Sequence, residues 1–137
     1  MTDLRSLAHD LYSLISKHDL DGFADLLADD MIEHEELPFP DSPKGKAGVR
    51  MLFQSMLDAF PDFEMAVEDV IVEGDKVVIR VRATGTHQGE FMGIPATGRR
   101  VEVPLIDIMR VRDGKIAEHW GVMDGGVMMQ QLGVGTG

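Results

Sequence analysis

The spacing of hydrophobic residues in this 137-residue chain changes once, at Pro61, and no other feature constrains the fold as strongly. Before Pro61, apolar residues recur every three or four positions, which is typical of amphipathic helices. The spacing predicts helices at Leu4–Ile15, Leu20–Leu27 and Val49–Phe60. Thr2 is the expected N-cap of the first helix.

The stretch Met31–Pro43 contains three prolines and is expected to separate the second helix from the third. After Pro61 the apolar residues alternate, which indicates strands, and two turn sequences divide them into two hairpins. The predicted strands are Phe63–Val72, Lys76–Thr86, Val101–Val111 and Lys115–Met123, with a short final helix at Gly125–Leu132.

Helices followed by antiparallel strands predict one α+β domain over residues 1–137, with the helices on one face of a curved sheet. If the sheet bends, the two layers enclose a cone-shaped apolar pocket. No internal repeat or domain linker divides the chain.

The second hairpin allows the side chains that face this pocket to be predicted. If Asp113 and Gly114 are its two turn residues, Asp107 lies opposite Trp120 on one face of the hairpin. His119 then lies on the reverse face. The pocket face is otherwise apolar and is predicted to carry Val101, Val103, Leu105, Asp107, Met109, Val111, Ile116, Trp120, Val122 and Asp124.

Asp107 and Asp124 require an explanation on such a face, because an unpaired buried charge is costly. A carboxyl group in an apolar pocket is a candidate general acid or base. Alternatively, Asp107 pairs with Arg80 or Arg82, and Asp124 caps the last helix. A capping role and a catalytic role for Asp124 are compatible.

Charge and composition exclude several functions. The net charge of −11 opposes binding to nucleic acid or an anionic membrane, and nine of those charges lie within residues 1–43 as a solvated helical face. No cysteine is present, so disulfides and thiol chemistry are excluded. The opening MTDLRSLAHD has no signal-peptide pattern, and no apolar run reaches membrane-spanning length, so a cytoplasmic protein is expected.

The residues from Val67 to Asp124 resemble the SnoaL-like polyketide or ester cyclase family of the nuclear-transport-factor-two-like superfamily. The resemblance is most specific in GTHQGEFMGIP, Gly85–Pro95, and in the DIMR and EHW motifs, Asp107–Arg110 and Glu118–Trp120. It is looser in the front part, through DMIEH, Asp30–His34, and FPD, Phe60–Asp62.

This resemblance implies an α+β barrel around a deep hydrophobic pocket, usually in a homodimer, and aldol cyclisation of a small hydrophobic molecule without metal or organic cofactor. Asp124 matches the family's proton-abstracting aspartate, and His34 matches a family histidine that would be its polar partner. Met109 stands near the position where the characterised cyclases commonly have a histidine, and the chain contains no asparagine as an oxyanion donor.

The remaining candidates have structural alternatives. Tyr12 flanks the apolar stripe of the first helix, so its hydroxyl could reach the pocket, although core packing explains it equally. His87 ends a strand and is expected either to contact substrate or to hold the glycine-rich loop. His34 could be an exposed loop residue, and Trp120 could be core. No metal-binding spacing is found.

The sequence therefore predicts catalytic Asp124 and His34, with Trp120, Asp107, Met109, Leu105, Tyr12 and His87 binding substrate. The leading hypothesis is a cofactor-independent cyclase-type enzyme. The alternatives are a non-catalytic ligand-binding module, or an isomerase, dehydratase or epoxide hydrolase of the same fold.

Overall fold

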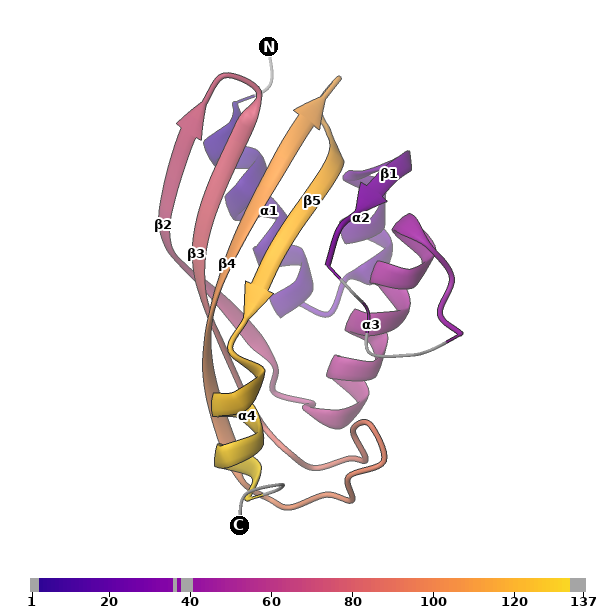
Figure 1. Cartoon of the computed structure of the whole chain (residues 1–137), viewed down its shortest axis with the longest axis vertical. Helices are drawn as coiled ribbons and strands as arrows, with labels where there is room; N and C mark the ends of the chain where they lie inside the picture. The colour runs from indigo at the N-terminus through magenta and orange to yellow at the C-terminus, as the bar shows by residue number, and fades with distance from the viewer. Residues whose placement is uncertain (1–2, 36, 38–40, 134–137) are drawn as a thin grey trace.

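A computed structural model describes residues 3–35, 37 and 41–133, and it is an α+β fold in which helices cover one face of a curved sheet (Figure 1). The helices are α1 (Leu4–Ser16), α2 (Leu20–Asp25), α3 (Gly45–Ala59) and α4 (Gly125–Leu132). The strands are β1 (Leu27–Glu33), β2 (Glu64–Glu73), β3 (Lys76–Thr86), β4 (Arg100–Arg112) and β5 (Lys115–Met123). The predicted fold class is therefore confirmed, with a sheet that curves but does not close.

The strands are arranged in the order β1-β5-β4-β3-β2. Both predicted hairpins, β2–β3 and β4–β5, are present, and β3 joins them by pairing antiparallel to β4. The buried face of β4 carries the predicted alternate residues, from Val101 through Asp107 to Val111. Hydrophobic alternation is a local property, and it identified all four of these strands.

Strand β1 is a correction to the sequence analysis, which extended the second helix to Leu27 and placed an interruption from Met31. Leu27–Glu33 instead pairs parallel with β5, and Glu33 lies beside His119 in that pairing. Its burial pattern is irregular, with Asp29 and Asp30 both exposed, so hydropathy alternation gave no signal for this strand. A parallel partner 86 residues away is also invisible to local pattern reading.

A β-bulge in β5 corrects the predicted facing of the second hairpin. Val111 pairs with Ile116, but Arg110 pairs with Glu118, so Ala117 is an extra residue on β5. Because side chains alternate between faces, one extra residue reverses every position after it. His119 therefore faces the helices and Trp120 faces outward, the opposite of the prediction.

Helix caps explain where α1 and α4 begin. Asp3 caps α1 by accepting a hydrogen bond from the Arg5 backbone N–H at 3.0 Å, and Thr2, the expected cap, lies outside the described residues. Asp124 caps α4 by accepting from the Val127 N–H at 3.0 Å, as its structural alternative predicts. None of the described helices has the length and apolar character needed to cross a membrane.

Candidate active site

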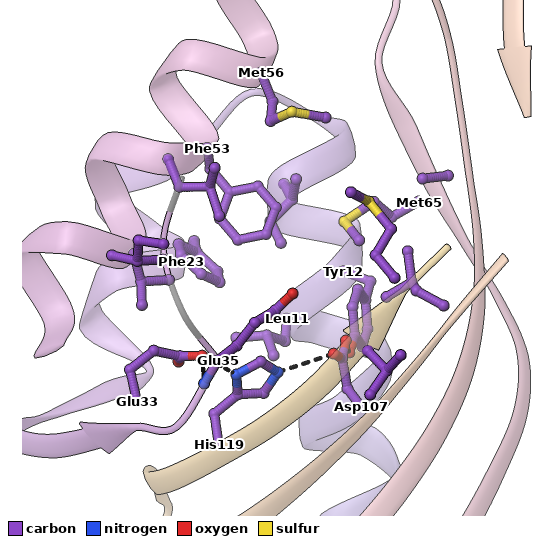
Figure 2. A pocket seen from close by; sticks show the side chains of 18 of the residues that line it. Leu11, Tyr12, Phe23, Glu33, Glu35, Phe53, Met56, Met65, Asp107 and His119 are labelled. Atoms are coloured by element: carbon purple, nitrogen blue, oxygen red, sulfur yellow. Dashed lines mark hydrogen bonds and ion pairs between the residues drawn. The ribbon is translucent and has the colours of Figure 1, made fainter. Parts of the chain in front are cut away.

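A cavity of about 300 Å³ lies between the sheet and helices α1, α2 and α3. Most of the side chains around it are apolar, including Phe23, Phe53 and Met56 (Figure 2). Five polar side chains gather in one region of its wall, contributed by α1, the end of β1 and the segment that follows it, β4 and β5. They are Tyr12, Glu33, Glu35, Asp107 and His119.

Asp107 is a buried carboxylate, with the residue 6% exposed. Its Oδ2 accepts a short hydrogen bond from the Tyr12 hydroxyl, and its Oδ1 lies 2.9 Å from His119 Nε2. These two partners, from α1 and β5, compensate the cost of burying the charge. Neither of the arginines considered from the sequence is its partner, since Arg80 and Arg82 bind Glu68 on the outer face.

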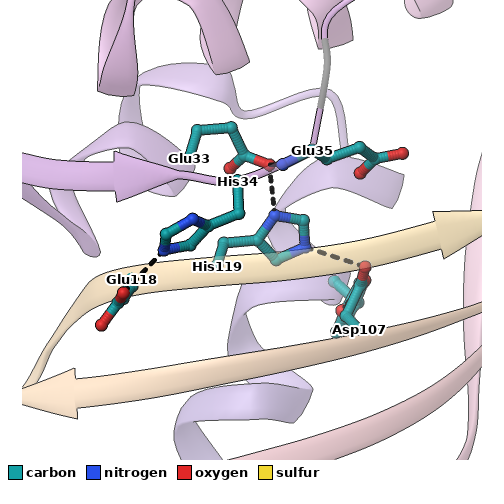
Figure 3. Close-up of polar contacts among 7 residues, drawn as sticks. Glu33, His34, Glu35, Asp107, Glu118 and His119 are labelled. Carbon is teal, nitrogen blue, oxygen red and sulfur yellow. Dashed lines mark hydrogen bonds and ion pairs between the residues drawn. The ribbon is translucent and has the colours of Figure 1, made fainter.

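His119 connects two carboxylates (Figure 3). Its Nδ1 lies 2.5 Å from Glu33 Oε1, while its Nε2 bonds Asp107. Burial opposes the charged ring, but the hydrogen bonds and charges of Asp107 and Glu33 outweigh it and raise the pKa of His119 to about 10. At neutral pH the ring is therefore an imidazolium that donates from both nitrogens.

Glu33 keeps one oxygen without a partner. Its side chain is 6% exposed, and Oε2 is buried with no hydrogen-bond partner within the described part of the chain. Its other oxygen, Oε1, accepts from His119 and, at 3.3 Å, from the Glu35 backbone N–H. A buried acceptor left unpaired indicates a place where a ligand or water donates.

Glu35 lies half-buried at the same end of the cavity, and its carboxyl group bonds to no side chain within residues 3–35, 37 and 41–133. Burial raises the pKa of Glu35, the neighbouring Asp107 and Glu33 raise it further, and His119 offsets part of the effect. Glu35 is therefore a carboxyl group of the cavity that has a pKa above its usual value and no side-chain partner within the described residues.

Gly121 on β5 creates the space in which these groups meet. A Cβ at this position would lie 2.6 Å from Asp107 Oδ1, 2.8 Å from Glu35 Oε2 and 2.8 Å from His119 Cε1. Any side chain would force the three apart.

Four of the predicted substrate-binding residues line this cavity: Leu105, Asp107, Met109 and Tyr12. Trp120 and His34 do not, because the bulge in β5 and the alternation of β1 place them on the outer face. The two rings stack there with centroids 4.7 Å apart, and His34 Nε2 lies 2.6 Å from Glu118. Their predicted placement in the pocket is wrong.

Asp124 is exposed at the start of α4 and is not among the cavity-lining residues, so its predicted position inside the pocket is also wrong. Its catalytic role remains a prediction. His87 is fully buried but lies outside the cavity lining. Its Nδ1 lies 3.0 Å from the Thr97 hydroxyl and 3.2 Å from the Thr97 backbone N, and this arrangement fits the loop-holding alternative.

Glu33, Glu35 and His119 offer ligand atoms within 4.8 Å of one another and are the described group that could hold a metal ion. The imidazolium proton already occupies this centre, so a cation would have to displace it. Sequence reasoning missed these three residues because the bulge and the parallel β1–β5 pairing bring together positions with no recognisable spacing. The alternation of Glu33 and Glu35 in DMIEHEE was the one available signal.

Comparison with known proteins agrees with this architecture. The chain is 35% identical to IdmH, a putative polyketide cyclase from Streptomyces antibioticus, covering 97% of this chain and 100% of that one with a TM-score of 0.83. It is 33% identical to AclR, a putative hydroxylase from Streptomyces galilaeus, covering 94% of each chain with a TM-score of 0.84.

A curated relative, the aklanonic acid methyl ester cyclase DnrD from Streptomyces peucetius, is 36% identical over 58 residues, which are 41% of this chain and 40% of that protein. The match therefore spans less than half of the curated relative. The family model described as SnoaL-like polyketide cyclase matches residues 5–132, nearly the whole chain. This chain belongs to the SnoaL-like polyketide cyclase family.

Proposed function

We propose that this protein is a cofactor-independent enzyme that closes a ring in a small hydrophobic carbonyl compound by intramolecular aldol condensation. The observation that carries the proposal is Glu35, a half-buried carboxyl group without a side-chain partner in the described structure, at the polar end of an otherwise apolar cavity. Family membership and the name of the curated cyclase support the same reaction class.

Glu35 is proposed to transfer the proton in both steps of the reaction. As a carboxylate it removes a proton from the carbon next to a carbonyl, and the enolate carbon then attacks a second carbonyl carbon of the same molecule. The electrons of that C=O bond move to its oxygen, which takes the proton back from Glu35. Atoms and charge balance without an additional reactant, and burial of Glu35 brings its pKa closer to working pH.

The Glu33–His119–Asp107 network is proposed to act through its charge and rigidity. Both His119 nitrogens already bond carboxylates, so the ring does not serve as the base. Its positive charge offsets the charges of Glu33 and Asp107, and Glu33 also accepts a hydrogen bond from the Glu35 backbone N–H at 3.3 Å, so the network holds the proposed base in position. The apolar walls hold the two reacting carbons together, which lowers the entropic cost of ring closure.

The first prediction is that Glu35→Gln keeps the fold and loses at least about a hundredfold in kcat, the usual contribution of a positioned acid or base. Aklanonic acid methyl ester, the compound in the name of the curated relative, serves as probe, and ring closure is followed by chromatography. In the parent protein, kcat should rise with pH through an inflection above 4.5, since activity needs ionised Glu35 and its pKa is raised.

Two matched variants complete this experiment. Glu73→Gln makes the same chemical change at the exposed end of β2 and should leave kcat unchanged. Asp124→Asn tests the residue proposed from sequence, since asparagine caps a helix as well as aspartate does. Full activity in Glu35→Gln, or a loss confined to Asp124→Asn, would refute the assignment of Glu35.

A further inference from the structure

We infer that the polar end of the cavity binds ligands that present a hydrogen-bond donor, such as a phenol or enol hydroxyl, and rejects ligands that present a carboxylate. The inference uses the same cavity as the proposed function and deepens it by naming the ligand class. It concerns binding, so it can be tested without turnover.

The hydrogen-bond donors at this end of the cavity are already used, whereas acceptors remain. The Tyr12 hydroxyl is already donated to Asp107. The two His119 N–H groups are already donated to Glu33 and Asp107. What remains unpaired, among the residues the structure describes, is acceptor capacity on Glu33 Oε2 and on the Glu35 carboxyl group. A ligand that completes these bonds must bring the hydrogen atoms itself.

Negative charge predominates at this end of the cavity. Three carboxyl groups, Glu33, Glu35 and Asp107, face one imidazolium, His119. No lysine or arginine occurs among the described residues that line the cavity. A ligand carboxylate would add a further negative charge in a partly desolvated site with no free cation to receive it, which costs binding energy. A neutral hydroxyl meets no such penalty.

The remaining wall of the cavity is apolar. Beyond the polar end, the lining is aliphatic and aromatic, with Phe23 and Phe53 in edge contact at 5.2 Å between centroids. Such a wall suits a flat apolar body, which would orient a single polar group toward Glu33 and Glu35. The ligand class is therefore a ring compound or folded chain with a hydroxyl at one end.

Three naphthalene probes separate these features: 2-naphthol donates a hydrogen bond, 2-methoxynaphthalene accepts only, and 2-naphthoate carries a carboxylate. We expect calorimetric titration at pH 7 to show 2-naphthol binding about tenfold or more tighter than 2-methoxynaphthalene, the size of one hydrogen bond to a charged acceptor. The affinity of 2-naphthoate should be weaker still. Equal affinities, tighter binding of the naphthoate, or no saturable binding of any probe would overturn the inference.

Two variants assign the effect to the cavity. Glu35→Gln should shrink the preference for 2-naphthol and improve the relative affinity of 2-naphthoate, whereas Glu73→Gln, exposed on β2, should change neither ratio. If the relative affinities of the three probes are unchanged in Glu35→Gln, Glu35 does not determine the ligand preference and the inference is wrong for this residue. If the parent protein shows the probe selectivity and Glu35→Gln loses it but retains turnover, only the proposed function is contradicted, so the two failures are distinguishable.

Discussion

At the scale of single residues, His119 shows how tertiary contacts change what a side chain can do. A histidine with an ordinary pKa near 6.5 is a natural proton acceptor at neutral pH. Here the ring is held between Glu33 and Asp107, and its pKa rises to about 10, so it stays charged and acts as a fixed cation. The proposed function therefore assigns proton transfer to Glu35, the neighbouring carboxyl group without a side-chain partner in the described structure.

The raised pKa of His119 predicts a pH-dependent stability. A group whose pKa is higher in the folded state than in the unfolded state stabilises fully below the unfolded value, near 6.5, and loses that contribution as pH rises through about 10. His119→Gln should therefore be less stable than the parent by roughly 3–5 kcal/mol at pH 6, because two buried carboxylates lose their cation. The difference should shrink toward pH 10.

Urea unfolding at a series of pH values measures this difference. His9→Gln, at an exposed position on α1, is the matched control, and its free energy of unfolding should depend on pH as that of the parent does. If the difference in free energy of unfolding between His119→Gln and the parent stays constant from pH 6 to pH 10, the charge of the His119 ring does not stabilise the fold.

At the scale of elements, strand β5 decides the composition of the site. The bulge at Ala117 turns His119 toward the helices, and Gly121 two residues later lets the backbone approach Asp107 and Glu35. Both features are properties of the strand backbone, so the site depends on the path of β5 as much as on its acidic and basic side chains.

Gly121→Ala should lower both stability and turnover. The added Cβ would stand 2.6 Å from Asp107 Oδ1 and 2.8 Å from Glu35 Oε2, so we expect a loss of about 1–3 kcal/mol, as for overpacked cores. Urea unfolding and the ring-closure assay measure the two effects. Gly126→Ala on α4, where the added Cβ would lie 3.6 Å from Asp124 Oδ1, should be neutral or stabilising by up to about 1 kcal/mol. Parent-like behaviour of Gly121→Ala would show that the site adapts to a side chain there.

At the scale of the whole molecule, the outer face of the sheet carries apolar groups that the helices do not cover. Ile106 and Val122 are paired across β4 and β5 and are 50% and 76% exposed, and Ile108 beside Trp120 is 37% exposed. Arg82, with Glu68 and Glu102, provides ion pairs on the same face. A patch with both apolar groups and charges of both signs can pair with itself about a twofold axis.

The family resemblance implies a homodimer, and we propose that its two copies associate through this outer patch. Light scattering should give a mass about twice the 15.1 kDa of one chain, and Ile106→Glu should return it to a single chain. Two glutamates would be buried in each symmetric interface, which opposes association. Met51→Glu, on helix α3 on the other side of the sheet and 37% exposed, is the control and should remain dimeric. A monomeric parent protein would contradict the proposal.

The sequence by itself determined the elements whose signals are local. Helical spacing predicted α1 and α3, alternation predicted β2 to β5, and Asp-Gly at residues 113 and 114 located the second turn. The pocket face of β4, including Leu105, Asp107 and Met109, followed from alternation alone. These features depend on residues within a few positions of each other, so periodicity is sufficient to find them.

The tertiary structure alone decided which groups share the polar end of the cavity. Because of the extra residue at Ala117, His119 faces the cavity in place of Trp120. The parallel pairing of β1 with β5 brings Glu33 and Glu35 beside Asp107. Asp124, placed in the pocket by unbroken alternation, became an exposed helix cap. Register shifts and pairing between distant strands are fixed by packing of the whole sheet, and a local pattern carries no information about them.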